Sequence, residues 1–337
     1  MTHRIFAVVA DQWRACVISR RKLLAGSAAA LSVPFVAEAA PLRRVGILAQ
    51  DLQPGLLETF RDELQRLGYV EGSRLEIELR NAAGRSDRLS ALADDLLRLK
   101  VEVIVAVNTP AALAAKKATA TVPIVIMRVA DPVKSGLVPS LAHPDGNVTG
   151  LSFMPDVLGA KGIEMLREIL PSVSRVASLY RGDNPGAVVV VRETERRSAQ
   201  LRLQYLDLPI RGPSELPAAF DAAVRARTEA IFVIDDGAMT KLRVPVLELA
   251  ARHALPVVSI YRDFATAGGL IAYGPSLPTV YRRAAYYVDR ILKGQPARSL
   301  PVEQPTKFDL VVNLKTAKAL GLTIPPSVML RADEVIE

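Results

Sequence analysis

The sequence has little of the chemistry that metal sites and disulfide scaffolds need. Cys16 is the only cysteine among 337 residues, and the three histidines, His3, His143 and His253, are far apart. One cysteine cannot form an intrachain disulfide, and so few scattered thiol and imidazole ligands do not make a zinc site. Aromatic residues are only 5% of the chain. These shortages predict a protein with no metal and no disulfide.

Enzyme signatures are also missing. The chain has no Gly-Lys-Ser/Thr phosphate loop, no His-Glu-x-x-His zinc motif and no Gly-x-Gly-x-x-Gly after its first predicted strand. The Gly-x-Ser-x-Gly nucleophile elbow is absent too, because Gly150-Leu151-Ser152-Phe153 continues with Met154. We therefore expect neither a nucleotide cofactor nor another cofactor, and no catalytic residues.

Charge is modest and evenly spread. The net charge is +8, and residues 1–39 hold five basic and two acidic residues, which leaves +5 for the remainder. No basic run longer than two residues occurs there, and no basic stripe alternates with aromatic residues. Because nucleic-acid sites need clustered positive charge, we expect no nucleic-acid partner. A hydrophobic content of 50% with 23% charged residues is typical of a globular protein with room for two domains.

Residues 1–39 have the pattern of an export signal. A basic cluster, Arg20-Arg21-Lys22, precedes an apolar stretch from Leu23 to Val36, and Ala37-Glu38-Ala39 offers the small residues that a signal peptidase reads. Arg20-Arg21 also resembles a twin-arginine motif. We expect a periplasmic protein that begins near Ala40; an uncleaved N-terminal anchor is the alternative.

Short apolar runs alternate with helical patterns along the rest of the chain. Runs rich in Val and Ile indicate buried parallel strands. They lie at Arg44–Ala49, Leu75–Leu79, Glu102–Val107, Ile124–Val129, Val176–Tyr180, Leu203–Leu208, Ala230–Ile234, Val257–Ile260, Leu270–Tyr273 and Phe308–Val312. Strands that alternate with helices predict an α/β fold with parallel sheets.

The alternating units divide into two blocks. The turn Pro144-Asp145-Gly146-Asn147 separates them. The remaining strands and helices are too few for a third domain, so we expect the chain to return to each block in turn. The predicted lobes are residues 40–150 with 270–298, and residues 151–269 with 299–337.

Polar residues cluster just after the carboxyl ends of the predicted strands, where open α/β sheets bind ligands. Thr109 is predicted to cap the helix that follows, which suits a carboxylate, and Asp235 or Asp236 would hold an ammonium group. Tyr261 or Tyr273 would pack on the rest of the ligand. The ten candidate ligand-binding residues are Gln50, Asp51, Asn108, Thr109, Asp131, Asn184, Asp235, Asp236, Tyr261 and Tyr273.

Several stretches resemble one known family. They include Asp131–Val138, Gly146–Gly150, Gln304–Phe308 and the tail Asn313–Leu322. With these stretches, residues 42–337 resemble the substrate-binding proteins of bacterial ABC transporters, in the branch associated with aromatic amino acid uptake.

This resemblance implies a type 1 periplasmic-binding fold: two Rossmann-like lobes with parallel sheets, joined by a three-strand hinge, that close on a small ligand. It also implies an ABC permease and a cytoplasmic ATPase as partners. The expected function is capture of an amino acid or other small carboxylate. An exported α/β enzyme such as a hydrolase, and a ligand sensor with the same fold, remain the alternatives.

Overall fold

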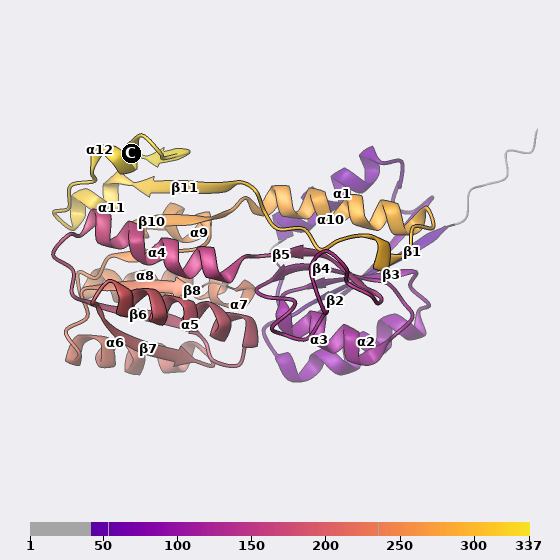
Figure 1. Ribbon diagram of the computed structural model, residues 1–337, viewed down its shortest axis with the longest axis horizontal. Coiled ribbons are helices and arrows are strands. Elements are labelled where there is room, and N and C mark those ends of the chain that lie inside the picture. Colours follow the sequence, from indigo (N-terminus) through magenta and orange to yellow (C-terminus); the bar gives the residue numbers. More distant parts are fainter. Residues whose placement is uncertain (1–41, 53, 235) are drawn as a thin grey trace, which may run out of the picture. The chain divides into compact units, whose positions relative to one another are not determined.

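The computed structural model describes residues 42–52, 54–234 and 236–337, and these form one compact unit. Their strands make two separate sheets, each covered by helices (Figure 1). No helix of these residues is long and apolar enough to cross a membrane.

The first sheet contains five parallel strands in the order β2-β1-β3-β4-β5. They are β1 (Arg43–Ala49), β2 (Leu75–Asn81), β3 (Val103–Val107), β4 (Ile124–Val129) and β5 (Val148–Ser152). Every residue of the central strand β3 is buried, which explains why its sequence is an unbroken apolar run. At the edge, β2 is mostly half-buried and alternates polar with apolar residues.

Helices cover both faces of this sheet. They are α1 (Pro54–Arg66), α2 (Leu89–Arg98), α3 (Thr109–Ala118) and α10 (Leu277–Leu292). The stripes of apolar residues in α1 and α10 share one core with alternate side chains of β1 and β3, including Phe60, Leu64 and Tyr281. The side chains of β1 and β3 that point the other way pack against α2 and α3. The alternating side chains of the strands and the apolar faces of the helices thus pack together in two layers of core, one on each face of the sheet.

The second sheet contains seven strands in the order β12-β11-β10-β9-β8-β6-β7. They are β6 (Arg175–Arg181), β7 (Gln204–Ile210), β8 (Ala230–Ile234), β9 (Val257–Ser259), β10 (Ile271–Pro275), β11 (Phe308–Asn313) and β12 (Glu334–Ile336). All neighbouring pairs are parallel except β10 and β11, which are antiparallel. The predicted α/β fold with parallel sheets is confirmed, with β10–β11 as its antiparallel pair.

The remaining helices belong to the second sheet or follow its strands. They are α4 (Pro155–Ile169), α5 (Pro185–Gln200), α6 (Leu216–Arg225), α7 (Gly237–Lys241), α8 (Arg243–Arg252), α9 (Arg262–Thr266), α11 (Leu314–Ala319) and α12 (Pro326–Met329). Figure 1 shows α10 beside α1, together with the first sheet, although its neighbours in sequence, β10 and β11, belong to the second sheet.

Three segments connect the lobes, but they do so at positions other than those expected. Residues 270–298 were expected to return to the first lobe, yet β10 hydrogen-bonds to β9 in the second sheet and only α10 returns. Residues 299–303 were expected in the second lobe. They stay with the first, because Thr149 Oγ1 donates to the Leu300 carbonyl at 2.7 Å and Glu303 forms a bridge with Leu151. An extended segment pairs with whichever sheet edge is open beside it, and hydropathy does not reveal that edge.

Candidate functional site

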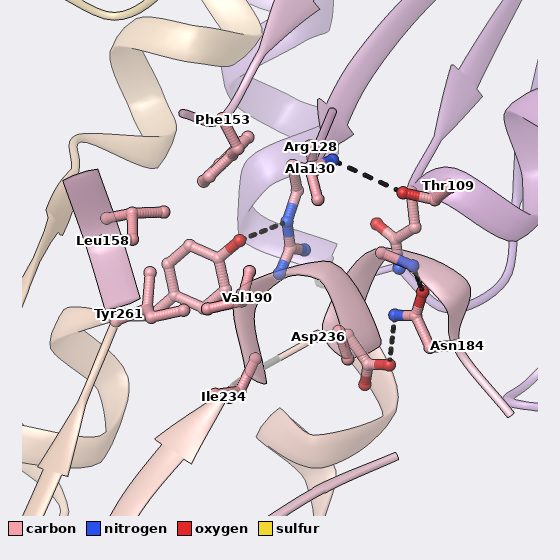
Figure 2. Close-up of a pocket in the computed structure, with 14 residues that line it drawn as sticks. Thr109, Arg128, Ala130, Phe153, Leu158, Asn184, Val190, Ile234, Asp236 and Tyr261 are labelled. Atoms are coloured by element: carbon pink, nitrogen blue, oxygen red, sulfur yellow. Dashed lines mark hydrogen bonds between the residues drawn. The ribbon is translucent and has the colours of Figure 1, made fainter. Parts of the chain in front are cut away.

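Strands β3, β4 and β5 of the first sheet and β6, β8 and β9 of the second end near one cavity, which lies between the lobes. Its lining residues come from β4 and β8, from the segments that follow β3, β4, β5, β6, β8 and β9, and from helices α4 and α5 (Figure 2). The cavity is small, with a volume of about 40 Å³. Because carboxyl ends of parallel strands present helix N-termini and loops, such an edge is where open α/β sheets bind ligands. One end of the cavity is polar and the other apolar.

Asn108 supplies a buried amide to the polar end. It occupies the N-cap position of α3 with φ 79° and ψ 159°, and in this conformation its side chain makes no capping hydrogen bond. The residue is 2% exposed, and within the described part of the chain neither its Oδ1 nor its Nδ2 has a hydrogen-bond partner. A buried amide without partners costs about 1–3 kcal/mol, so this side chain is suited to a polar group placed in the cavity.

Thr109 and Pro110 begin α3 beside this amide. Thr109 was expected to be the cap, but the cap is Asn108 and Thr109 is the first helical residue. The Ala130 amide donates a long hydrogen bond, 3.4 Å, to Thr109 Oγ1. The amides at the start of α3 have no acceptor within the helix and carry partial positive charge, which favours an anion.

Arg128 is a lining residue that the sequence interpretation missed. It lies in β4, where the pairing with β5 shifts register between Ile126 and Val129, and its φ is 58°. Such an irregularity turns a side chain that would otherwise follow the strand alternation. The side chain is almost fully buried; Nε donates to Tyr261 Oη at 3.3 Å, and Cζ lies 4.6 Å from the Tyr261 ring centroid. An arginine within the apolar run Ile124–Val129 was the available signal.

A second tyrosine, Tyr281 of α10, also lies close to this guanidinium. Burial raises the pKa of Tyr281, while the positive charge of Arg128 opposes that rise. Arg128 therefore brings a buried positive charge, bordered by two phenol rings, to the polar end of the cavity.

Asn184 and Asp236 supply the polar groups of the second lobe, and each caps a helix. Asn184 Oδ1 accepts from the Gly186 amide at 2.9 Å at the start of α5. Asp236 Oδ1 accepts from the Ala238 and Met239 amides at 3.0 and 2.8 Å at the start of α7. Asn184 Nδ2 donates to Asp236 Oδ2 at 2.8 Å, which ties the two helix starts together (Figure 2).

The apolar end is built from both lobes. Phe153 and Tyr261 meet edge to face with centroids 5.8 Å apart and planes at 84°. Leu158, Val190, Ile234 and Ile260 complete this surface. An edge-to-face aromatic pair beside aliphatic side chains offers a flat or branched hydrocarbon group a close-packed surface.

Half of the ten sequence candidates line this cavity: Asn108, Thr109, Asn184, Asp236 and Tyr261. Asp235 lies outside the described residues. The other four are not among the residues that line it.

Those four have structural partners elsewhere. Gln50 Nε2 donates to Ser86 Oγ at 2.8 Å, and Asp51 pairs with Lys241. Asp131 Oδ1 accepts from the Val133 and Lys134 amides, which shapes the turn after β4. Tyr273 stacks on Phe308 with centroids 5.6 Å apart, in the antiparallel pair β10–β11.

Two lobes with central parallel sheets, three connecting segments and a small amphipathic cavity between strand ends define a type 1 periplasmic-binding fold. The chain belongs to the family described as ABC transporter substrate binding protein, which matches residues 47–336. This confirms the family that the sequence resembles.

A curated relative and two solved structures agree with this family and fold. The chain is 25% identical over 264 residues to a protein named "Tyrosine-binding protein" from Clostridioides difficile strain R20291, covering 78% of this chain and 75% of the relative. It is 27% identical to a conserved domain protein from Vibrio cholerae, with a TM-score of 0.82 over 87% of this chain and 99% of that one. A Streptococcus pneumoniae domain in complex with L-Trp has the same fold at 23% identity, with a TM-score of 0.81 over 88% of this chain and 100% of that one.

Proposed function

We propose that the cavity binds a small α-amino acid with an apolar or aromatic side chain. The observation that carries this proposal is the buried Asn108 amide, which has neither of its polar atoms paired among the described residues and lines a cavity whose opposite end is apolar. A ligand with a hydrogen-bond donor and acceptor at one end and a hydrocarbon group at the other would pair the Asn108 amide and fill the apolar end of the cavity.

The two charges of an amino acid have separate places in this arrangement. The α3 N-terminus and the buried Arg128 favour the carboxylate. The ammonium group belongs near Asp236, whose Oδ2 accepts a hydrogen bond from Asn184. Asp235, the residue before it in the chain, remains the other candidate. Phe153 and Tyr261 would contact the side chain. The relatives named for tyrosine and crystallised with L-Trp support this ligand class.

Binding rather than catalysis is the proposed role. Among the described lining residues none is a serine, cysteine or histidine, and the one aliphatic hydroxyl, on Thr109, lies at a helix start with no base beside it. This disfavours the hydrolase alternative. By membership of its family, the protein would deliver its ligand to an ABC permease driven by a cytoplasmic ATPase.

The pattern of residues 20–40 supports export to the periplasm, with a mature chain that begins near Ala40. Mass spectrometry of the periplasmic fraction tests this, and recovery of the full-length chain from the cytoplasm alone would contradict it.

Thermal unfolding with a ligand panel tests the binding proposal. We expect L-tyrosine, L-tryptophan or L-phenylalanine at millimolar concentration to raise the Tm, because a ligand that binds only the folded state stabilises it. Arabinose and the amine-free analogue phenylpropionate are the controls, and neither should match the best amino acid. If phenylpropionate stabilises the protein as strongly as L-phenylalanine, the ammonium assignment is wrong. If no amino acid shifts the Tm, the ligand class is wrong.

A further inference from the structure

Both ends of the five-residue helix α7 contact Asp51 of the first lobe. At its start, a Cβ atom added to Gly237 would lie 2.8 Å from the Asp51 carbonyl oxygen and 3.0 Å from Asp51 Cβ. At its end, Lys241 Nζ lies 2.7 Å from Asp51 Oδ1. Asp51 follows β1 in the first lobe, while α7 follows β8 in the second, so these contacts join the lobes.

The ion pair has one buried and one exposed partner. The Asp51 side chain is 1% exposed and the Lys241 side chain is 56% exposed. The Asp51 carboxylate also accepts from the Leu52 amide at 2.8 Å, within its own lobe. A carboxylate that loses water needs a positive partner, and here the ammonium comes from the opposite lobe. Separation of the lobes would return both groups to water, so the pair favours only the closed arrangement.

The same helix borders the ligand cavity. Asp236 lines the cavity and accepts the Ala238 and Met239 amides that begin α7. Neither Asp51 nor Lys241 lines the cavity. A ligand that fixes Asp236 therefore also fixes the helix whose two ends contact Asp51.

We propose that the Asp51–Lys241 pair stabilises the closed lobes and so sets ligand affinity without touching the ligand. Contacts present only in the closed state shift the open–closed equilibrium, and the apparent affinity changes in proportion to the population able to bind. Lys241 is thus a positioning residue. The inference concerns closure and goes beyond the identity of the ligand.

Lobe distance can be measured directly, because the chain has a single cysteine to remove. The full chain with Cys16→Ser receives two labelling sites, Val70→Cys in the first lobe and Val224→Cys in the second, where the native valines are 44% and 45% exposed. Single-molecule energy transfer between dyes there reports the distance between the lobes. Lys241→Met is the test variant, Lys241→Arg keeps the charge, and Lys318→Met removes an exposed lysine that does not line the cavity.

Each chain is measured without amino acid and during titration with L-tyrosine. We expect Lys241→Met to lower the closed fraction and to raise the Kd for L-tyrosine three- to tenfold, whereas Lys241→Arg and Lys318→Met stay within twofold of the parent. Raising NaCl from 0.1 to 1 M should shrink the difference between parent and Lys241→Met, since salt screens a partly exposed pair.

The proposal is overturned if Lys241→Met and Lys318→Met share one distance distribution and, where L-tyrosine binds, Kd values within twofold of each other. If L-tyrosine binds none of the chains, the binding proposal is in doubt, and the distance distributions without amino acid still decide the role of Lys241.

Discussion

Gly186 at the start of α5 lies against Thr109 at the start of α3, with no room for a methyl group between them. A Cβ atom at Gly186 would be 2.3 Å from Thr109 Oγ1 and 3.1 Å from Thr109 Cβ. The two residues come from opposite lobes and both line the cavity. The absence of a side chain at Gly186 thus permits the closed contact.

Gly186→Ala should therefore hold the lobes apart. Rotation of the Thr109 side chain can move Oγ1 away, but the 3.1 Å contact with Thr109 Cβ remains, so the helix starts must still separate. We expect the Kd for the best amino acid to rise about ten- to a hundredfold, or about 1.4–2.8 kcal/mol. Each lobe should still fold, because alanine is a better helix residue than glycine. Calorimetric titration measures the affinity.

Gly212→Ala is the matched control, because nothing lies within 4 Å of a Cβ at that glycine. The double variant Gly186→Ala, Thr109→Ala removes Oγ1 and should recover part of the lost affinity. A Gly186→Ala protein that binds as tightly as the parent would show that the contact does not limit closure.

Asp236→Asn should abolish most amino acid binding if Asp236 holds the ammonium group. Loss of one partner of a desolvated ion pair costs about 3–5 kcal/mol, or about two to three and a half orders of magnitude in Kd. The asparagine Oδ1 can still accept the Ala238 and Met239 amides, but its Nδ2 then faces Asn184 Nδ2, so the Tm without ligand should also fall. Calorimetry and thermal unfolding of the same samples separate the two effects.

Thr109→Ala and Asp235→Asn complete this comparison. Thr109→Ala should cost less affinity, because the backbone amides of α3 still face the carboxylate. If Asp236→Asn and Asp235→Asn both bind within threefold of the parent, the ligand has no ammonium group held by these aspartates.

Asn108→Gly should weaken binding without unfolding the first lobe. Glycine adopts the φ of 79° without strain, whereas alanine there would add backbone strain to the loss of the amide. Removal of an unpaired buried amide offsets the extra chain entropy of glycine, so the free energy of unfolding without ligand should stay within about 1 kcal/mol. We expect a ten- to hundredfold higher Kd, measured by calorimetry. An unchanged Kd would place the ligand away from Asn108.

Glu303→Gln should make the free energy of unfolding less dependent on pH at acid pH. Glu303 lies on the third connection between the lobes, and Arg283 of α10 donates to both its carboxylate oxygens at 2.8 and 2.5 Å. This hydrogen bonding lowers the pKa of Glu303 below its usual 4.5 in the folded state. Its contribution is therefore complete above pH 4.5 and is lost as the pH falls through the lower, folded pKa.

The pair is about two-fifths exposed, so we expect less than about 1 kcal/mol from it. Urea unfolding between pH 7 and pH 3 measures it. The parent should lose more stability than Glu303→Gln over that range, and parallel profiles would contradict the assignment. Lys318→Met serves as a variant that leaves this carboxylate untouched.

The sequence predicted most strands from their apolar runs, whether the strands are fully buried like β3 or partly exposed like β2 and β7. The ten predicted strands correspond to β1–β4 and β6–β11, whereas β5 and β12 were missed. The β5 residues Val148–Ser152 include Gly150 and end in serine, a composition typical of a turn, and β12 has only three residues. Gly150 is required there because a Cβ would lie 2.2 Å from the Ile126 carbonyl oxygen. Such a close approach of two strands is not visible in a hydropathy pattern.

The residues that line the cavity were predicted only in part, for a related reason. Polar residues at strand ends pointed to Asn108, Thr109, Asn184, Asp236 and Tyr261, which the structure brings together. The strand-end rule also selected Gln50, Asp51, Asp131 and Tyr273, because it marks an edge of a sheet and does not say which point of that edge faces the other lobe. It missed Arg128, which lies inside a strand and is turned by an irregular register.

The sequence by itself determined the α/β class, the positions of ten strands and the family, because apolar runs and helix ends can be recognised from neighbouring residues alone. Only the tertiary structure decided that β10 joins the second sheet, that Gly186 meets Thr109, and that Lys241 pairs with Asp51. The Gly186–Thr109 and Lys241–Asp51 contacts depend on how the two lobes approach one another, whereas β10 joins the second sheet by pairing with β9 and β11. These contacts join residues that are distant in sequence and fit together by shape and charge, so no local sequence pattern predicts them.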